Sequence, residues 1–229
     1  MQAVNLRLLA IQFIGLFTLF AVALFMGAGT IFWLSGWLFL LLFFGFLVIL
    51  TAWLSKHNPA LLQERMTGLG KDNRPRWDKV FFAGLQLMFL AWLSFMPLDA
   101  VRFHWSHVPL WLRVSGAALL IVSFYLLFLV FRENSYLSPA VRLQADRGQT
   151  VVSTGPYRYV RHPMYAAVIL FVIGPSFLLG SWYGLLPGLL LISGMAYRAL
   201  REEQVLKAGL PGYEAYMAKV KYRFVPHLW

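Results

Sequence analysis

The sequence IFWLSGWLFLLLFFGFLVILTAWL, residues 31–54, contains no charged side chain. A helix of about 20 apolar residues is long enough to cross the hydrocarbon layer of a bilayer, which is roughly 30 Å thick. A backbone in hydrocarbon must satisfy its own hydrogen bonds, and an α-helix does so within one segment. The stretch therefore predicts a membrane-spanning helix.

Five further apolar stretches lie on either side of this one. They cover residues 8–28, 80–98, 110–131, 164–179 and 184–197. Only the residues Gly-Ser-Trp-Tyr at 180–183 separate the last two, which predicts a tight helical hairpin. None of the stretches shows the alternation of a membrane β-strand. The sequence therefore predicts an all-α fold, a polytopic transmembrane helical bundle of about six spans that forms a single membrane domain, residues 1–229.

The composition agrees with this class and excludes several kinds of site. Hydrophobic residues make up 60% of the chain and charged residues 13%, whereas soluble domains carry about 25% charged residues. The chain has no cysteine, which excludes disulfides, thiolate metal ligands and a cysteine nucleophile. Its five histidines are too few for the histidine boxes of a membrane di-iron oxygenase, so we expect no metal site.

The positive charges lie almost entirely on one side of the expected spans. One Lys or Arg precedes the first span, six lie in residues 55–79, five in 132–162 and six from 198 onward, whereas Arg102 and Arg113 lie on the other side. The positive-inside rule then places both termini in the cytoplasm. We attribute the net charge of +11 to this topology and not to nucleic acid binding. We expect a multi-pass integral membrane protein of the bacterial inner membrane.

The segment 56–79, between the second and third spans, is the one stretch that resembles a soluble linker. Asn58-Pro59 and Gly68-Leu69-Gly70 are the residues expected to break helices there.

Polar residues gather in two stretches on the expected cytoplasmic side. The first is QADRGQTVVSTGPYRYVRHPMY, residues 144–165. Gly155-Pro156 predicts a turn, and Pro163 suits the first turn of the fifth helix, where a missing N–H is tolerated. The free amides of that helix start favour an anion near residues 162–165. The rings of Tyr157, Tyr159 and Tyr165 could hold a cation. The alternative is a belt of interfacial Tyr and Arg side chains.

The second polar stretch is YRALREEQ, residues 197–204, where the sixth helix leaves the membrane. Arg198 and Glu202 are four residues apart and so share one face of that helix, whereas Glu203 points elsewhere. The alternative is a solvated helix end with an ordinary ion pair between Arg198 and Glu202. Further on, Tyr213 and Tyr216 belong to an amphipathic tail that we expect on the surface.

These motifs together resemble those of the isoprenylcysteine carboxyl methyltransferase and phospholipid methyltransferase superfamily. The similarity rests on the run from Gly155 to Tyr165, on Arg198-x-x-x-Glu202-Glu203, and on the later Gly-Tyr-Glu-Ala-Tyr and Arg-x-x-Pro motifs, and it covers residues 140–229. It implies an S-adenosylmethionine pocket at the cytoplasmic face and a lipid-like acceptor that enters from the bilayer. Residues 132–229 would then form the cofactor-binding loop, the helical hairpin and a cytoplasmic tail, after four spans in residues 1–131.

The resemblance also assigns roles to residues. It implies these cofactor-binding residues: Gln144, Gln149, Thr150, Val151, Val152, Tyr157, His162, Pro163, Met164, Tyr165 and Glu202. Arg198 falls where the superfamily has a substrate-contacting arginine, so Arg198 and Glu202 are the expected catalytic pair. Ala167 departs from the pattern, because the family often has glycine at this position. The methyl group of alanine leaves slightly less room for close contact with a neighbouring helix.

Glu202 could pair with the ammonium of the cofactor, and Arg198 could hold an acceptor carboxylate or phosphate through two hydrogen bonds. The sequence leaves the acceptor open between an isoprenylcysteine-like carboxylate, a phospholipid amine and a small hydrophobic thiol. Two other functions stay open at this point. One is an NADPH-dependent membrane reductase of a sterol-like or polyprenoid-like lipid, and the other is a non-catalytic membrane protein.

Overall fold

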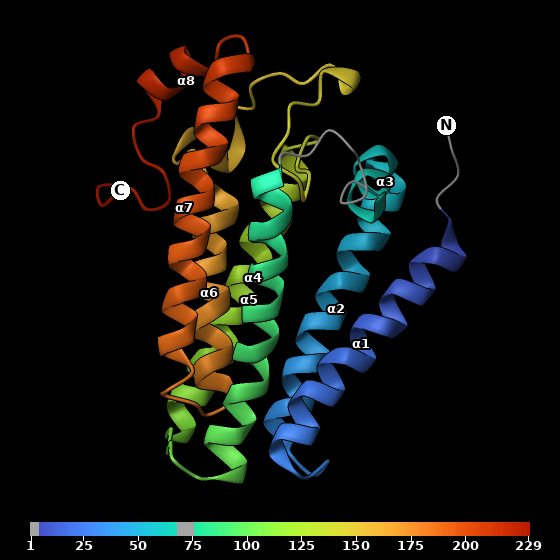
Figure 1. Ribbon diagram of the computed structural model, residues 1–229, viewed down its shortest axis with the longest axis vertical. Helices are drawn as coiled ribbons and strands as arrows, with labels where there is room; N and C mark the ends of the chain where they lie inside the picture. Colours follow the sequence, from blue (N-terminus) through green and yellow to red (C-terminus); the bar gives the residue numbers. More distant parts are fainter. Residues whose placement is uncertain (1–4, 68–75) are drawn as a thin grey trace.

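A computed structural model describes residues 5–67 and 76–229, and all the regular structure within these residues is helical (Figure 1). In this described part of the chain, four helices are long and apolar enough to span a membrane: α1 (Leu6–Ala28), α2 (Leu34–His57), α4 (Arg76–Pro97, continued by the π-helical turn Leu98–Arg102) and α5 (Leu110–Glu133). The all-α, multi-span class is therefore confirmed. The apolar helix α6 (Pro163–Leu178) is shorter, and α7 (Leu185–Gly209) mixes apolar and charged residues, so six crossings remain a prediction.

The linker after α2 differs from the expectation. Helix α3 (Pro59–Thr67) begins directly at Asn58-Pro59. The Asn58 side chain accepts a hydrogen bond from the Leu61 amide at 3.1 Å, and proline suits the first helical position, so this pair starts a helix as well as ending one. The expected breaker Gly68-Leu69-Gly70 lies outside the described residues.

The sixth helix continues beyond its apolar stretch, as the shared helix face of Arg198 and Glu202 required. Helix α7 runs on to Gly209, because Ala, Leu, Arg, Glu and Lys are strong helix formers whether or not lipid surrounds them. The helix therefore carries Arg198, Glu202 and Glu203 on a rigid element beyond its apolar half.

Helices α5 and α6 approach each other closely at two glycines. A Cβ atom on Gly116 would lie 2.6 Å from the carbonyl oxygen of Gly174, so the two backbones touch there. Further along the same contact, the Ser123 hydroxyl donates to the Ala167 carbonyl at 2.8 Å. Ala167 is fully buried in this contact, so the structure accommodates the departure from the family pattern.

At the far end of the bundle, a buried carboxylate fastens the hairpin between α6 and α7. Asp99 accepts hydrogen bonds from Ser106 at 2.6 Å and from Ser181 at 2.5 Å. Trp92 of α4 donates to the Gly184 carbonyl at 2.8 Å. These contacts fix the angle at which α7 returns along α4.

The opposite end collects the polar motifs. Figure 1 places the start of α1, the C-terminal tail, the start of α6 and the end of α7 at this end of the bundle, and the loops before α2, α5 and α7 at the other. Arg102 and Arg113 lie at that other end, where their side chains donate to backbone carbonyls of Met26 and Val108.

The topology can be tested with reporter fusions. Fusions after Leu54 and Phe131 should report the cytoplasm, and fusions after Gly29 and Ala100 should report the opposite side, because positive residues are retained in the cytoplasm. A fusion at residue 140 that reports the far side would contradict this topology.

The glycine contact between α5 and α6 gives a second prediction. Gly116→Val should destabilise the fold by roughly 1–3 kcal/mol, because the added atoms overlap the α6 backbone. Gly45→Val is the control, since nothing lies within 4 Å of a Cβ at that position on α2. Thermal unfolding in detergent compares them, and equal stabilities of the two variants would refute the close contact.

Candidate functional site

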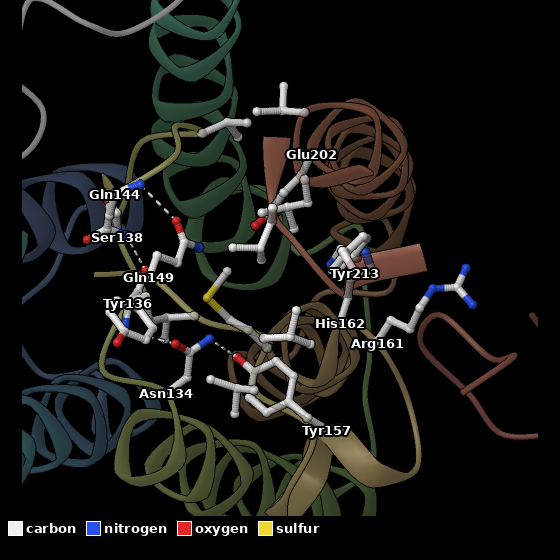
Figure 2. Close-up of a pocket in the computed structure, with 18 of the residues that line it drawn as sticks. Asn134, Tyr136, Ser138, Gln144, Gln149, Tyr157, Arg161, His162, Glu202 and Tyr213 are labelled. Carbon is white, nitrogen blue, oxygen red and sulfur yellow. Dashed lines mark hydrogen bonds between the residues drawn. The ribbon is translucent and has the colours of Figure 1, made fainter. Parts of the chain in front are cut away.

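A pocket opens at the polar end of the bundle, between the loop after α5, the start of α6, the end of α7 and the short helix α8 (Tyr213–Lys219) (Figure 2). The residues to which the family resemblance gave a role all line this pocket: Gln144, Gln149, Thr150, Val151, Val152, Tyr157, His162, Pro163, Met164, Tyr165, Arg198 and Glu202. The fold thus brings together the two motifs that the sequence keeps 33 residues apart, from Tyr165 to Arg198.

The turn at Gly155 places Tyr157 in the pocket wall. Gly155 has φ of +54°, and a Cβ there would lie 2.7 Å from a carboxylate oxygen of Glu133, so both conformation and space favour glycine. The one-turn 3₁₀ helix η4 (Gly155–Arg158) follows. The Tyr157 hydroxyl accepts from Asn134 at 2.8 Å. Burial raises the pKa of this hydroxyl, so Tyr157 presents a neutral ring to the pocket.

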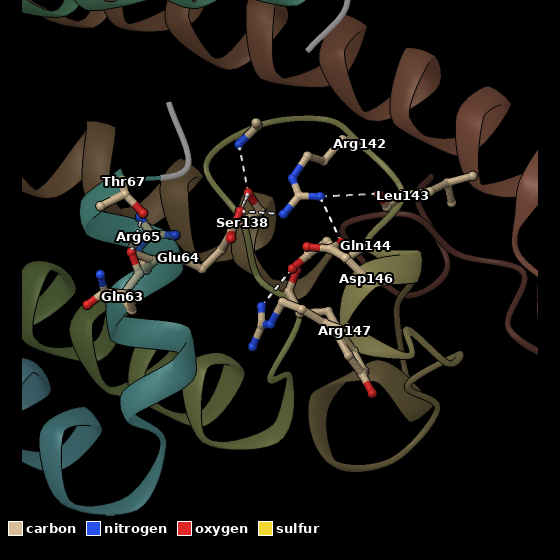
Figure 3. Close-up of polar contacts among 12 residues, drawn as sticks. Gln63, Glu64, Arg65, Thr67, Ser138, Arg142, Leu143, Gln144, Asp146 and Arg147 are labelled. Atoms are coloured by element: carbon tan, nitrogen blue, oxygen red, sulfur yellow. Dashed lines mark hydrogen bonds and ion pairs between the residues drawn. The ribbon is translucent and has the colours of Figure 1, made fainter. Parts of the chain in front are cut away.

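The polar loop that carries Gln144 is held in place by α3 (Figure 3). The Glu64 carboxylate accepts from Ser138 and Arg142, both at 3.0 Å. Within the loop, Gln149 accepts from the Gln144 amide at 2.8 Å. Arg142 and Glu64 are both buried, so helix α3 acts as a support for this wall of the pocket.

The three arginines among the lining residues each have a carboxylate partner outside the lining. Arg142 pairs with Glu64 at 3.0 Å, Arg161 with Glu203 at 2.6 Å, and Arg198 with Asp78 at 3.3 Å. The expected alternative of an ordinary Arg198–Glu202 pair is therefore wrong, because Arg198 turns toward α4.

Glu202 is left with a neutral partner. Its carboxylate accepts from the Tyr165 hydroxyl at 2.8 Å, and no Lys or Arg of residues 5–67 and 76–229 forms an ion pair with it. Figure 2 shows Glu202 reaching from α7 toward the pocket interior, with Tyr157 across from it. A carboxylate beside aromatic rings is an environment that suits a cation.

Glu203 has a role that the sequence did not reveal. It was expected to point elsewhere, and it is buried as the acceptor of three side chains: Arg161 at 2.6 Å, Arg223 at 3.0 Å and His162 at 3.2 Å. The amides of Arg161 and His162 also donate to the carbonyls of residues 222 and 223, both at 2.9 Å. Glu203 therefore joins α7, the start of α6 and the C-terminal tail.

The C-terminal tail covers the pocket. Tyr213 and Tyr216 belong to the tail that was expected on the surface, and the side chains of both are buried and line the pocket. The Tyr216 hydroxyl donates to the Tyr157 carbonyl at 2.7 Å, which satisfies two polar groups at once. By contrast, Tyr159 is 63% exposed and lies outside the pocket lining, so the expectation that its ring faces a ligand is wrong.

The start of α6 offers fewer free amides than the sequence suggested. The amides of Tyr165 and Ala166 donate to the His162 carbonyl, and Pro163 has none. The Met164 amide is then the donor that this helix start presents to an anion.

The charge of Glu203 predicts a pH dependence of stability. Burial by itself would raise the pKa of this carboxyl, but its hydrogen bonds with His162 and Arg161 lower the pKa from 4.5 to about 2. Because the pKa of Glu203 is lower in the folded state than in the unfolded state, its charge stabilises the fold at a pH above the unfolded-state pKa. This stabilisation is lost as the pH falls toward the folded-state pKa. Unfolding of the wild type should therefore become easier from about pH 4.5 downward.

Glu203→Gln should lose most of this acid dependence and, at neutral pH, about 3 kcal/mol of stability, because it leaves buried Arg161 without its counter-charge. Thermal unfolding between pH 7 and about pH 3 in detergent measures both effects. An acid slope equal to that of the wild type would contradict this assignment.

Comparison with known families agrees with the motifs. Residues 111–210 match the phospholipid methyltransferase family, from the start of α5 to the end of α7, so the match includes Tyr157, His162, Arg198 and Glu202. A comparison with curated proteins gave no match. Residues 111–210 are thus similar to the phospholipid methyltransferase family, which belongs to the isoprenylcysteine/phospholipid methyltransferase superfamily.

Proposed function

We propose that this protein is an S-adenosylmethionine-dependent methyltransferase of a lipid-like or isoprenylcysteine-like acceptor at the cytoplasmic face. The observation that carries the proposal is the carboxylate of Glu202, which faces the pocket with Tyr165 as its bonded partner. A carboxylate in such a pocket is costly without a positive partner, so a cationic ligand is the natural complement.

The residues present fit this cofactor. Its ammonium suits Glu202, and its carboxylate suits the amide of Met164 at the start of α6. The ring of Tyr157 suits its sulfonium, and the polar loop with Gln144, Gln149 and the backbone of residues 150–152 suits its nucleoside. When bound, the cofactor supplies an electrophilic methyl group.

The chain contributes positioning and exclusion of water. Methyl transfer is an in-line displacement, so its rate depends on holding donor and acceptor in one geometry. Tyr213 and Tyr216 close one side of the pocket, and Arg198 holds an acceptor carboxylate or phosphate at another. An acceptor carboxylate needs no base. An amine or thiol must lose a proton, and the Nε2 atom of His162, the nearest titratable nitrogen, is already bonded to Glu203.

The reductase alternative fits this site less well. The 2′-phosphate of NADPH is held best by several basic side chains that converge on it. Arg142 and Arg161 bond to the carboxylates of Glu64 and Glu203, and Arg198 keeps one nitrogen, Nε, without a partner within the described residues. Calorimetry with S-adenosylmethionine and with NADPH in detergent compares the two functions directly, and binding of neither would favour a non-catalytic protein.

The roles of Glu202 and Arg198 can be separated by substitution. Glu202→Gln should weaken S-adenosylmethionine binding roughly tenfold or more, because a hydrogen bond to a charged group contributes about 1.5–3 kcal/mol. Arg198→Ala should keep cofactor affinity near that of the wild type and abolish turnover. Arg198→Lys should restore turnover only in part, because an ammonium lacks the planar fork.

The matched control is Glu214→Gln, since Glu214 is exposed and pairs with Lys207 at the surface. Cofactor affinity and methyl transfer are measured for all four variants. Equal losses of cofactor affinity in Glu202→Gln and Arg198→Ala would refute the division of roles, and no loss in either would refute the site.

A further inference from the structure

The contacts of Arg198 come largely from helix α4, which lies outside the residues that match the family. Asp78, in the first turn of α4, is fully buried, and its Oδ1 atom lies 3.3 Å from Nη2 of Arg198. The same Nη2 donates to the carbonyl of Pro139 in the pocket loop at 2.6 Å. The guanidinium is therefore held from two directions at one of its nitrogens.

One helical turn after Asp78, a ring covers the guanidinium. The Cζ atom of Arg198 lies 5.4 Å from the ring centroid of Phe82. Residues four apart lie on the same face of a helix, so α4 presents a carboxylate and an aromatic ring to the same arginine. Asp78 also accepts from the amide of Val141 at 3.3 Å, which links α4 to the pocket loop.

The remaining edge of the guanidinium points to a ligand. The Nε atom of Arg198 is buried and has no hydrogen-bond partner within the described parts of the chain, although Arg198 lines the pocket. A buried donor without an acceptor is costly, so its persistence beside a pocket is explained best by an acceptor that arrives with a ligand.

We propose that Asp78 is a positioning residue for Arg198. Together with Phe82 it fixes the plane of the guanidinium, so that the Nε edge is presented to an oxyanion, carboxylate or phosphate, on the methyl acceptor. This inference rests on the proposed function, because it assigns Arg198 to the acceptor. It also means that the N-terminal helices, which carry none of the family motifs, build part of the acceptor site.

The test uses full-length protein in nanodiscs of phosphatidylethanolamine and phosphatidylglycerol, with methyl-labelled S-adenosylmethionine. Asp78→Asn should lower kcat/KM for the lipid acceptor at least tenfold and leave the Kd for S-adenosylmethionine within twofold of the wild type. In the Arg198→Lys background, which keeps part of the turnover, Asp78→Asn should lower kcat/KM by a smaller factor than in the wild type, because its effect passes through the guanidinium of Arg198. Asp78→Asn with unchanged kcat/KM, or with a parallel loss of cofactor affinity, would overturn the proposal.

The matched control is Asp99→Asn, a buried aspartate in the π-helical turn that continues α4 at the other end of the bundle, bonded to two serines. Asp99→Asn should change neither kcat/KM for the lipid acceptor nor the Kd for S-adenosylmethionine by more than twofold, even if it lowers thermal stability. A tenfold loss of kcat/KM in this variant would show that any loosening of this region has the same effect, and would overturn the specific role of Asp78.

A second readout does not depend on turnover. In ¹⁵N-arginine-labelled protein, the Nε–H signal of Arg198, identified by its absence in Arg198→Lys, should be resolved and slow to exchange with solvent. It should broaden or exchange rapidly in Asp78→Asn, and a signal that stays unchanged would overturn the proposal. If Asp78→Asn does not fold, Phe82→Leu takes its place. Phe82→Leu should lower kcat/KM about threefold and broaden the Nε–H signal of Arg198. If it changes neither, the proposal is overturned.

These measurements separate the two hypotheses. A wild type that binds no S-adenosylmethionine, while its Arg198 signal still depends on Asp78, would overturn the proposed function and with it the acceptor role. A wild type that binds and transfers methyl groups, with Asp78→Asn behaving as the wild type, would overturn only the role of Asp78.

Discussion

Hydrocarbon cannot solvate a polar group, and the rest of this structure follows from that constraint. Backbone bonds must close within each helix, so the long apolar stretches form α1, α2, α4 and α5. Charged and polar chemistry is then excluded from the middle of the bundle and collects where helices end. The pocket lies at such an end, where α6 begins and α7 leaves its apolar half.

The same constraint explains how the pocket keeps its arginines. A buried guanidinium is stable only with a counter-charge and good hydrogen bonds. The chain supplies these carboxylates from three directions: Glu64 from α3, Asp78 from α4 and Glu203 from α7. Each ion pair also links two elements that are distant in sequence. The charges that make the site possible are thus also the contacts that hold its walls together.

Glu202 and Glu203 are neighbours of the same residue type, and they have different surroundings and different roles. They lie on different sides of α7, because successive helical residues are about 100° apart. Glu203 faces the start of α6 and the tail, where three basic side chains surround it. Glu202 faces the pocket and bonds to a tyrosine. One carboxylate fastens the structure, and the other is available to a cation.

The sequence by itself determined the helical class and the boundaries of most spans to within a few residues, because apolar length and proline position are local properties. The resemblance of its motifs to a known superfamily indicated part of the pocket lining, including Tyr157, His162 and Glu202. The sequence did not determine that α3 exists, that Tyr213 and Tyr216 cover the pocket, or that Tyr159 faces away from it. Only the tertiary structure decided which carboxylate pairs with which arginine. Asp78 and Arg198 are 120 residues apart in the sequence, and they meet because α7 returns along α4. No local sequence pattern encodes such a contact.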